Sequence, residues 1–257
     1  MDTWRTAIVD AGPDHIRVRG HDVLELMTQA TFTDLIFLLH HDRLPLPAER
    51  RLLDAILIGV ADHGAGAPSC AAARLAASGN RQSPSAAIAA GVLTIGDEHG
   101  GAGSGCMDVI AEGLRRVKAA GLTMDAAAQQ LVEEARAAKT RLPGFGHRVH
   151  ATIDPRVDVL FTLARDSGLA GDGIRFARAL EVAVRERIKP IPLNIDGALA
   201  AILVDLGFPA MVGRLLFIIG RVAGLSAEVL EECTREKPMR IKIPVQYDGV
   251  PPVENGR

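Results

Sequence analysis

The chain has 257 residues and a formal net charge of −2, so no overall electric field attracts nucleic acid or an anionic membrane surface. Aromatic residues make up only 4% of the sequence, which argues against a surface on which nucleobases stack. Local arginines, rather than the charge of the whole protein, must therefore bind any anionic ligand.

Helix signals dominate the chain after its N-terminal segment. The run "DHIRVRG" is the best strand candidate and predicts half of a small hairpin. The predicted helices are marked by capping residues, by prolines in the first turn or by apolar stripes at helical spacing. In chain order they start near Ser83, Thr123, Asp154, Ile174 and Pro209. Gly224 would allow a bend in the last of them, and the sequence as a whole predicts an almost entirely α-helical protein.

Three features favour the cytoplasm. The N-terminal segment lacks the basic and apolar regions of a signal peptide. The most apolar segment, "MVGRLLFIIGRVAGL", is interrupted by Arg214 and Arg221 too soon for a membrane span. Cys70, Cys106 and Cys233 lie far apart and lack the spacing of zinc ligands, which favours buried free thiols in a reducing compartment. We therefore expect no bound metal and no membrane contact.

Four segments place a titratable side chain beside glycine, where the backbone can approach a ligand closely. The segments "ADHG", "GDEHGGAG", "GFGHRVH" and "LNIDG" carry, in this order, His63, His99, His147 and Asp196. Each is a weak signal alone. A single loop histidine is more often a surface residue than a catalyst, and Asp196 could merely cap the helix that follows it.

Three arginines strengthen the functional reading. Arg221 interrupts an otherwise apolar helix face, and its burial would require an anionic partner. Arg156 lies at a helix start, where the helix dipole disfavours a positive charge, and Arg148 directly follows His147. An ordinary ion pair explains Arg148 as well as a ligand does, whereas a ligand is favoured for Arg221.

Histidines, a carboxylate and guanidinium groups together suit one type of chemistry. Arginines grip a polycarboxylate, a histidine hydrogen-bonds an oxygen on which charge develops, and a carboxylate moves a proton at carbon. This combination favours making or breaking a carbon–carbon bond beside a carbonyl group. The chain has neither an HxxxH pair nor a GxSxG motif, so it predicts neither a metal site nor a serine nucleophile.

The segment "LPGFGHRVHATIDPR" resembles the signature segment of citrate synthases. The segment "TAIVDAGPDHIRVRGHDVLELMTQATFTDLIFLLHHDRLP" is similar to the N-terminal region of that family, and "ADHG", "AAGVLTIGDEHGGA", "LNIDG" and "GRVAG" follow in the family's order. The resemblance covers nearly the whole chain. It implies an all-α, citrate-synthase-like fold with a large domain (1–100 and 208–257), a small domain (101–207) and an active-site cleft between them.

The resemblance also implies a role for each candidate residue. His99 would bind the thioester or enol oxygen of an acetyl-CoA unit, His147 the carbonyl or hydroxyl oxygen of the oxaloacetate unit, and Asp196 would move the proton at the acetyl carbon. The carboxylates would be bound by His63, Arg156 and Arg221. The loop expected to receive CoA comprises Pro143, Gly144, Phe145, Gly146 and Arg148.

Three details of the sequence bear on the direction of the reaction. Typical citrate synthases have a large helical segment before the "ADHG" loop, whereas here "ERRLLDAILIGV" leads straight into it. This short form resembles stand-alone citryl-CoA lyases and the citryl-CoA lyase module of ATP-citrate lyase. In "REKPMR", Lys237 stands where synthases have an arginine that reaches the partner subunit's site, so Lys237, Arg235 or Arg240 would take that role. His99 is synthase-like, because the lyase module has an aromatic residue at its position.

We therefore predict a citryl-CoA lyase that cleaves citryl-CoA to acetyl-CoA and oxaloacetate, with the CoA thioester as substrate and no permanently bound cofactor. One alternative is a short synthase-like enzyme that condenses an acyl-CoA with oxaloacetate or another 2-oxo acid. Another is a non-catalytic regulator that binds CoA or citrate. The resemblance implies a homodimer acting on a di- or tricarboxylate, and a separate citrate-activating partner stays open. Neither nucleic acid nor a membrane is an expected partner.

Overall fold

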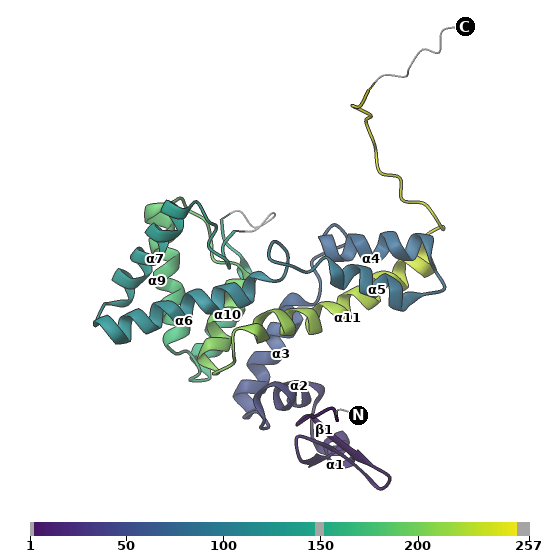
Figure 1. Ribbon diagram of the computed structural model, residues 1–257, viewed down its shortest axis with the longest axis horizontal. Coiled ribbons are helices and arrows are strands. Elements are labelled where there is room, and N and C mark those ends of the chain that lie inside the picture. Colours follow the sequence, from purple (N-terminus) through teal and green to yellow (C-terminus); the bar gives the residue numbers. More distant parts are fainter. Residues whose placement is uncertain (1–2, 147–151, 251–257) are drawn as a thin grey trace.

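The computed structural model describes residues 3–146 and 152–250 and is built almost entirely of helices, as the sequence predicts (Figure 1). Its strands are β1 (Val9–Gly12), β2 (His15–Val18) and β3 (His21–Asp22). Its helices are α1 (Val23–Gln29), α2 (Phe32–His41), α3 (Pro47–Ala61), α4 (Pro68–Gly79), α5 (Pro84–Leu93), α6 (Ala102–Ala120), α7 (Met124–Ala138), α8 (Pro155–Asp166), α9 (Asp172–Arg187), α10 (Ile195–Asp205) and α11 (Met211–Arg235).

The strands form a small antiparallel sheet in the order β1-β2-β3. The register pairs Val9 with Val18 and Gly12 with His15, so the predicted strand is one arm of a tight hairpin. Helices α1 and α2 follow the sheet, and this N-terminal part lies at the bottom of Figure 1.

Helix α10 forms the centre of the main core. Its residues 197–203 are all buried, which explains why this stretch is apolar on every side. Helices α6, α8 and α9 surround it, and Figure 1 shows α6, α7, α9 and α10 grouped on one side of the molecule. This packing holds the N-terminal end of α10, which carries Asp196, in a fixed position.

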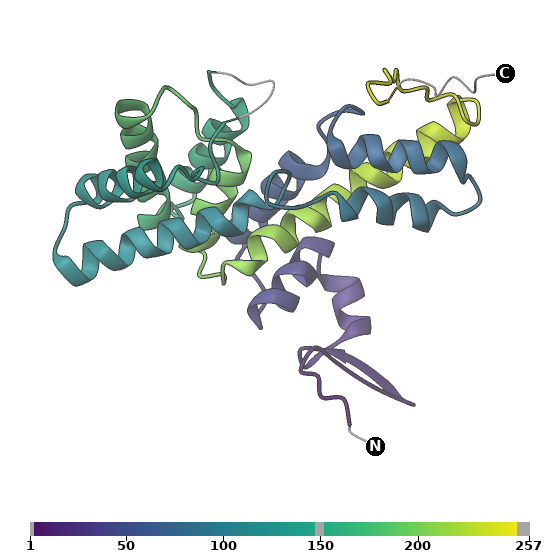
Figure 2. The same ribbon diagram turned by 45° about the horizontal axis from the view of Figure 1, so that its top comes forward.

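Helix α11 connects the two sides of the molecule. Figures 1 and 2 show its first half beside α6 and its second half beside α4 and α5. A Cβ atom on Gly224 would lie 2.1 Å from the carbonyl oxygen of Ala61, so this glycine allows the end of α3 to approach α11 closely. The helix is continuous from Met211 to Arg235 and so includes Gly224, where the sequence allows a bend.

Most predicted helix starts are confirmed. Thr123 caps α7 and Asp154 caps α8, each through its side-chain oxygen, and Pro84 and Pro155 occupy the first turns of their helices. The apolar stripe of α9 is buried up to Val184. Ile188, which follows the last helical residue Arg187, is exposed. In the described residues no helix is both long and apolar enough to cross a lipid bilayer.

Two of the three cysteines have the predicted environment. Cys70 and Cys106 are free and buried, whereas Cys233 is free but only half-buried. Burial raises the pKa of the Cys106 thiol to about 12, and the charge of Asp196 adds to this effect, so the thiol stays neutral.

Candidate active site

The last turn of α3 brings two of the predicted arginines together. Arg221 donates from Nε to the carbonyl oxygens of Val60 and Ala61, both at 3.1 Å, and Arg156 donates from NH1 to that of Gly59, also at 3.1 Å. The last carbonyl groups of a helix lack partners within the helix and carry partial negative charge. The end of α3 therefore fixes one arginine from α8 and one from α11 at the same place.

Arg156 is already paired with a carboxylate. Its Nε and NH2 atoms donate to the two oxygens of Asp154, at 2.9 and 2.8 Å. Asp154 is 1% exposed and also accepts from the backbone N–H of Ile195, at 3.1 Å. Asp154 thus links the start of α8 to the start of α10. Sequence reasoning saw in it only a helix cap, because an Asp-Pro pair at a helix start has no further signature.

Arg221 is buried, as predicted, with 3% of its surface exposed. Its NH1 donates to the hydroxyl of Ser69 at 2.8 Å, and its guanidinium carbon lies 5.0 Å from the centre of the Phe217 ring. Among the described residues no carboxylate forms an ion pair with it. A buried cation held only by neutral groups is suited to receive an anionic ligand.

Ser69 also fixes His99. Its hydroxyl lies 2.9 Å from Nε2 of His99, and its backbone N–H donates to the same nitrogen at 3.3 Å. Because an amide N–H can only donate, Nε2 is an acceptor, and the neutral ring carries its proton on Nδ1. The His99 ring also meets Phe217 edge-on, with ring centres 6.1 Å apart. Sequence reasoning missed Ser69 and Phe217, which have no sequence motif of their own.

We expect the Ser69→Ala variant to lower kcat/KM for the predicted cleavage of citryl-CoA about tenfold. The substitution removes an acceptor from Arg221 and a hydroxyl partner from His99, each worth on the order of 1 kcal/mol. Steady-state kinetics together with a thermal unfolding curve would check this result. Wild-type kinetics in a folded variant would show that Ser69 does not orient these side chains.

Asp196 does not cap α10. The cap is Asn194, whose Oδ1 accepts from the backbone N–H of Gly197 at 3.1 Å, and Asp196 lies in the first turn. The alternative structural role considered for Asp196 is therefore wrong. Its Oδ1 is shielded from solvent and has no hydrogen-bond partner among the described residues, which leaves this oxygen available to a ligand.

The surroundings of Asp196 adjust its acidity. Burial raises the pKa of its carboxyl from 3.8 to about 6. The positive charges of Arg156 and Arg221 act against this rise, and the negative charge of Asp154 adds to it. A carboxyl that titrates near neutral pH can both take up and release a proton in a reaction cycle.

The predicted CoA loop lies directly against the start of α10. The backbone N–H of Asn194 donates to the carbonyl oxygen of Gly144, and that of Gly146 donates to the carbonyl oxygen of Pro192, both at 2.9 Å. The side chain of Asn194 donates from Nδ2 to the carbonyl oxygen of Gly146 at 2.7 Å. Residues Pro143–Gly146 are therefore joined to the segment that carries Asp196.

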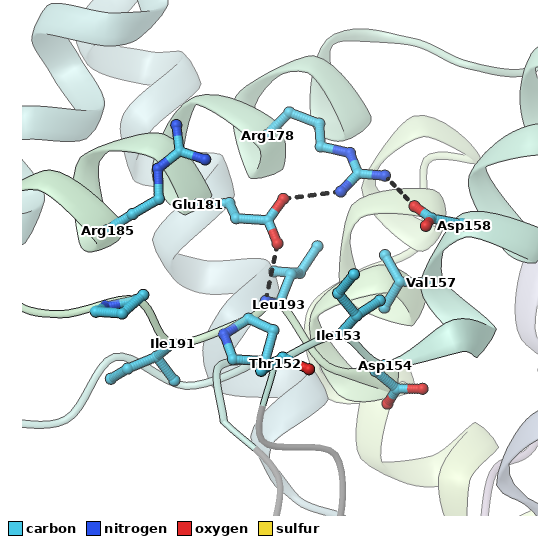
Figure 3. A pocket seen from close by; sticks show the side chains of 12 residues that line it. Thr152, Ile153, Asp154, Val157, Asp158, Arg178, Glu181, Arg185, Ile191 and Leu193 are labelled. Carbon is cyan, nitrogen blue, oxygen red and sulfur yellow. Dashed lines mark hydrogen bonds and ion pairs between the residues drawn. The ribbon is translucent and has the colours of Figure 1, made fainter.

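A cavity of about 290 Å³ adjoins the same segment on another side (Figure 3). In its wall, Arg178 donates to Asp158 and Glu181, both at 2.8 Å, and Glu181 accepts from the backbone N–H of Leu193 at 3.1 Å. These contacts support the chain just before Asn194 from α8 and α9.

The other predicted site residues are not shown to join the cluster of Asp196, His99, Arg156 and Arg221. His63 is exposed in the loop between α3 and α4. His147 and Arg148 lie outside the described residues. Lys237 is exposed beyond the end of α11, and the last residue of that helix, Arg235, is ~21 Å from Arg221 along the helix axis. The structure does not join Lys237 to the other candidate residues within one chain.

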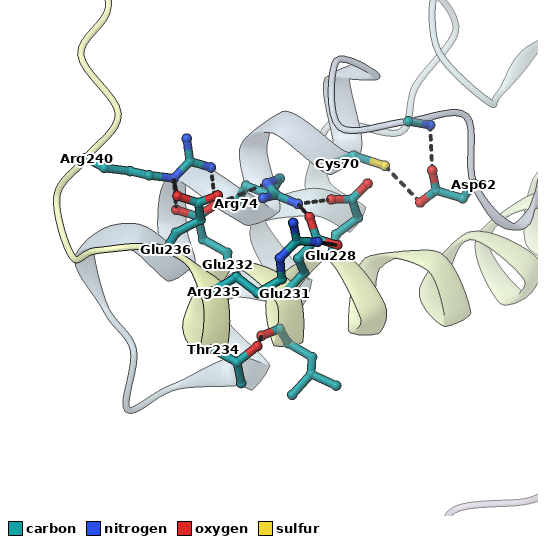
Figure 4. A network of polar contacts seen from close by, with 12 residues as sticks. Asp62, Cys70, Arg74, Glu228, Glu231, Glu232, Thr234, Arg235, Glu236 and Arg240 are labelled. Atoms are coloured by element: carbon teal, nitrogen blue, oxygen red, sulfur yellow. Dashed lines mark hydrogen bonds and ion pairs between the residues drawn. The ribbon is translucent and has the colours of Figure 1, made fainter.

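The segment around Lys237 is nevertheless firmly anchored (Figure 4). Glu232, fully buried, accepts from Arg74 of α4 at 3.1 Å and also binds Arg240. Arg81 donates to the carbonyl oxygens at the end of α11, including that of Cys233 at 2.6 Å. The chain after α11 therefore leaves the body from a fixed point.

A comparison with protein families agrees with this arrangement. The family described as "Citrate synthase, C-terminal domain" matches residues 45–242. The chain belongs to the citrate synthase family. It is 32% identical over 193 residues to the glyoxysomal citrate synthase of Cucurbita maxima, a match that covers 71% of this chain and 35% of that protein. The chain spans about a third of the length of this and of the Dictyostelium discoideum citrate synthase.

Two solved structures match almost the whole of this chain. The citryl-CoA lyase of Hydrogenobacter thermophilus superimposes with a TM-score of 0.89 at 37% identity, covering 98% of this chain and 97% of that one. An ATP citrate lyase variant of Methanosaeta concilii, in complex with (3S)-citryl-CoA, superimposes with a TM-score of 0.77 at 21% identity over 96% of this chain and 42% of that one. The predicted citrate-synthase-like fold and the resemblance to the lyases are confirmed.

Proposed function

We propose that this member of the citrate synthase family is a citryl-CoA lyase, which cleaves citryl-CoA to acetyl-CoA and oxaloacetate. The observation that carries the proposal is the likeness to the Hydrogenobacter thermophilus citryl-CoA lyase, which extends over almost the whole of both chains. The cluster of Asp196, His99 and two arginines supports it, because it supplies an anion site beside a group able to transfer a proton. The CoA thioester is the substrate, and no permanent cofactor is required.

The proposed mechanism assigns one task to each residue. Arg156, Arg221 and His63 bind the carboxylates of the citryl group, and His147 takes the proton from its tertiary hydroxyl. The bond between the hydroxyl-bearing carbon and the adjacent methylene then breaks, which yields oxaloacetate and the enolate of acetyl-CoA. The Nδ1–H of His99 donates to the enolate oxygen. Asp196, in its protonated form, gives its proton to the carbon.

We also propose the domain arrangement that the sequence predicts. Residues 1–100 and 208–257 would form the large domain and residues 101–207 the small one, with the site in the cleft between them. Closure of this cleft would exclude water from the enolate. The substrate would come from a separate reaction that joins citrate to CoA, because the mechanism includes no step that activates citrate.

An assay with purified protein tests the proposed function directly. A lyase converts citryl-CoA to oxaloacetate and acetyl-CoA without releasing a free thiol, whereas a synthase releases free CoA. We expect oxaloacetate to form and no thiol to appear. Release of free CoA from citryl-CoA, or from acetyl-CoA plus oxaloacetate, would identify the synthase alternative. Binding of citrate or CoA without any turnover would identify the regulator.

The acidity of Asp196 predicts how cleavage depends on pH. Cleavage needs the protonated carboxyl, so its kcat/KM should fall as the pH rises above about 6. Initial rates of citryl-CoA cleavage between about pH 5 and 8 would check this. A profile without an inflection near 6 would contradict the assignment of Asp196 as the acid.

We further propose that the protein acts as a homodimer. In α4 and α5 the one charged residue is Arg74, which is buried against α11. The outer side of these helices is nevertheless exposed and uncharged, with Leu75 at 48% and Leu93 at 85% exposure. A helix without a polar face is usually covered by other protein. A second copy would cover it and could bring Lys237 to the site of its partner.

Sedimentation equilibrium tests the dimer. We expect twice the chain mass for the wild type and a shift towards the monomer for Leu93→Glu, which would place a charge on the proposed interface. A wild-type protein that is monomeric at micromolar concentration would contradict the proposal. Glu98→Gln, which removes an exposed charge outside α5, serves as the control.

A further inference from the structure

We infer that Asn194 is a positioning residue that makes the loop Pro143–Gly146 and the carboxyl group of Asp196 move as one unit. The kinetic part of this inference rests on the proposed function, whereas the structural part does not. Asn194 lies at the junction of the two elements and is 8% exposed.

Both ends of the Asn194 side chain are in use. Its Oδ1 accepts from the backbone N–H of Gly197 at 3.1 Å, which caps α10, and its Nδ2 donates to the carbonyl oxygen of Gly146 at 2.7 Å. Its backbone N–H donates to the carbonyl oxygen of Gly144 at 2.9 Å. One residue therefore binds the loop at two points and the helix at a third.

A capping role alone does not require asparagine. Serine, threonine and aspartate cap helices about as well, because capping uses only an acceptor oxygen. The second contact needs a donor, which aspartate lacks and serine is too short to provide together with the cap. Asn194 thus has the side chain that can serve the loop and the helix at once.

The loop also packs tightly on the first turn of α10. A Cβ atom on Gly144 would lie 2.9 Å from the Cα atom of Gly197 and 2.7 Å from the sulfur of Cys106. A Cβ atom on Gly197 would lie 2.5 Å from the carbonyl oxygen of Gly144. These contacts leave no space for the loop to shift over the helix. Asp196 lies between Asn194 and Gly197 in the chain, so a displacement of the loop displaces Asp196 as well.

The coupling has a consequence for catalysis. A CoA thioester that presses on the loop would also set the position of the group that transfers the proton. Substrate binding and proton transfer should therefore respond together to any change that separates the loop from α10.

Hydrogen–deuterium exchange separates a positioning role from a capping role without any reference to activity. The amide of Gly146, bonded to Pro192, reports on the loop contact, and the amide of Gly197 reports on the cap. In the Asn194→Ser variant, which keeps a capping oxygen, we expect exchange at Gly146 to be about tenfold faster and exchange at Gly197 to be little changed. Unchanged exchange at Gly146 would overturn the inference.

Two further variants complete the experiment. Thr123→Ala removes the cap of α7, also on the small-domain side but remote from the loop, and should leave exchange at Gly146 unchanged. Asn194→Asp keeps the size and the cap but places an acceptor against the carbonyl of Gly146, so it should accelerate exchange there at least as much as serine does. If the Asn194→Ser variant does not fold, the Asn194→Asp variant alone tests the positioning role of Asn194.

The kinetic arm uses citryl-CoA with the same variants. We expect Asn194→Ser to raise KM several-fold and to lower kcat about tenfold, and Thr123→Ala to change neither. A rise in KM with an unchanged kcat would overturn the coupling, since the loop would then act without Asp196. Absence of cleavage by the wild type would refute the proposed function, and the exchange experiment would still decide the role of Asn194.

Discussion

Replacement of Asp196 by asparagine should reduce the turnover of citryl-CoA about a thousandfold and should also make the fold more stable. The loss of turnover follows because an amide cannot transfer the proton that the enolate carbon needs, and general acid–base groups contribute factors of about 10²–10⁴. The gain in stability follows from the acidity of the carboxyl. Its pKa is raised by burial from 3.8 to about 6, so ionisation at neutral pH destabilises the folded state.

The size and the pH range of the stability effect follow from the same shift. The Asp196 carboxyl holds its proton more tightly in the folded state than in the unfolded state, so its contribution to the free energy of unfolding falls as the pH rises from about 4 to about 6. This contribution is constant above that range. We expect Asp196→Asn to recover about 1–2 kcal/mol at pH 7 and almost nothing at pH 4.

Urea denaturation at both pH values, combined with the lyase assay, measures the two effects of Asp196→Asn. Asp205→Asn is a matched control at the other end of α10. The Asp205 carboxylate accepts from three backbone N–H groups at the start of α9, so its replacement should lower stability and spare kcat. A variant at Asp196 that keeps near-normal turnover would exclude this carboxyl as the acid.

Replacement of Arg221 by methionine should weaken the binding of oxaloacetate or citrate at least a hundredfold. The guanidinium is buried, and no described carboxylate neutralises it, so a bound carboxylate would be its anionic partner. Removing one member of such a buried pair costs about 2–5 kcal/mol of binding free energy. The unliganded fold should lose only moderate stability, because the loss of the hydrogen bonds to Val60, Ala61 and Ser69 is partly offset by the removal of a buried charge that has no carboxylate partner among the described residues.

Titration calorimetry with oxaloacetate measures this effect. Arg214→Met, on the same helix, is the control, because Arg214 pairs with the exposed Asp97 and should contribute little to binding. Equal affinities of the two variants would show that Arg221 is a structural residue. A large loss of stability in Arg221→Met alone would point to the same conclusion.

The sequence predicted the fold well because its signals are local. Proline in the first turn and a capping Asp154 or Thr123 mark helix starts. The ordered segments around His99 and Asp196 gave the family. Contacts between segments that are far apart in the sequence leave no such local signal and could not be predicted.

The site shows where this limit lies. Ser69 orients His99, and Asn194 orients the loop, through hydrogen bonds between distant segments of the chain. Neither residue has a motif that distinguishes it from an ordinary polar residue. The capping residue of α10 is Asn194, two positions before Asp196. Asn194 and Asp196 are both good capping residues, and only the backbone geometry decides between them.

The close contact at Gly224 sets the tolerance of the site to sequence change. The end of α3 is the common support of both arginines, and its distance from α11 is fixed by the missing side chain at this position. A methyl group there would push the end of α3 away from α11 and change the spacing between Arg156 and Arg221, which in the proposed mechanism bind the same substrate. A substitution at Gly224 would then alter substrate preference even though Gly224 is not one of the proposed ligand-binding residues. The effect of such a substitution should be judged by how far it moves the end of α3 from α11.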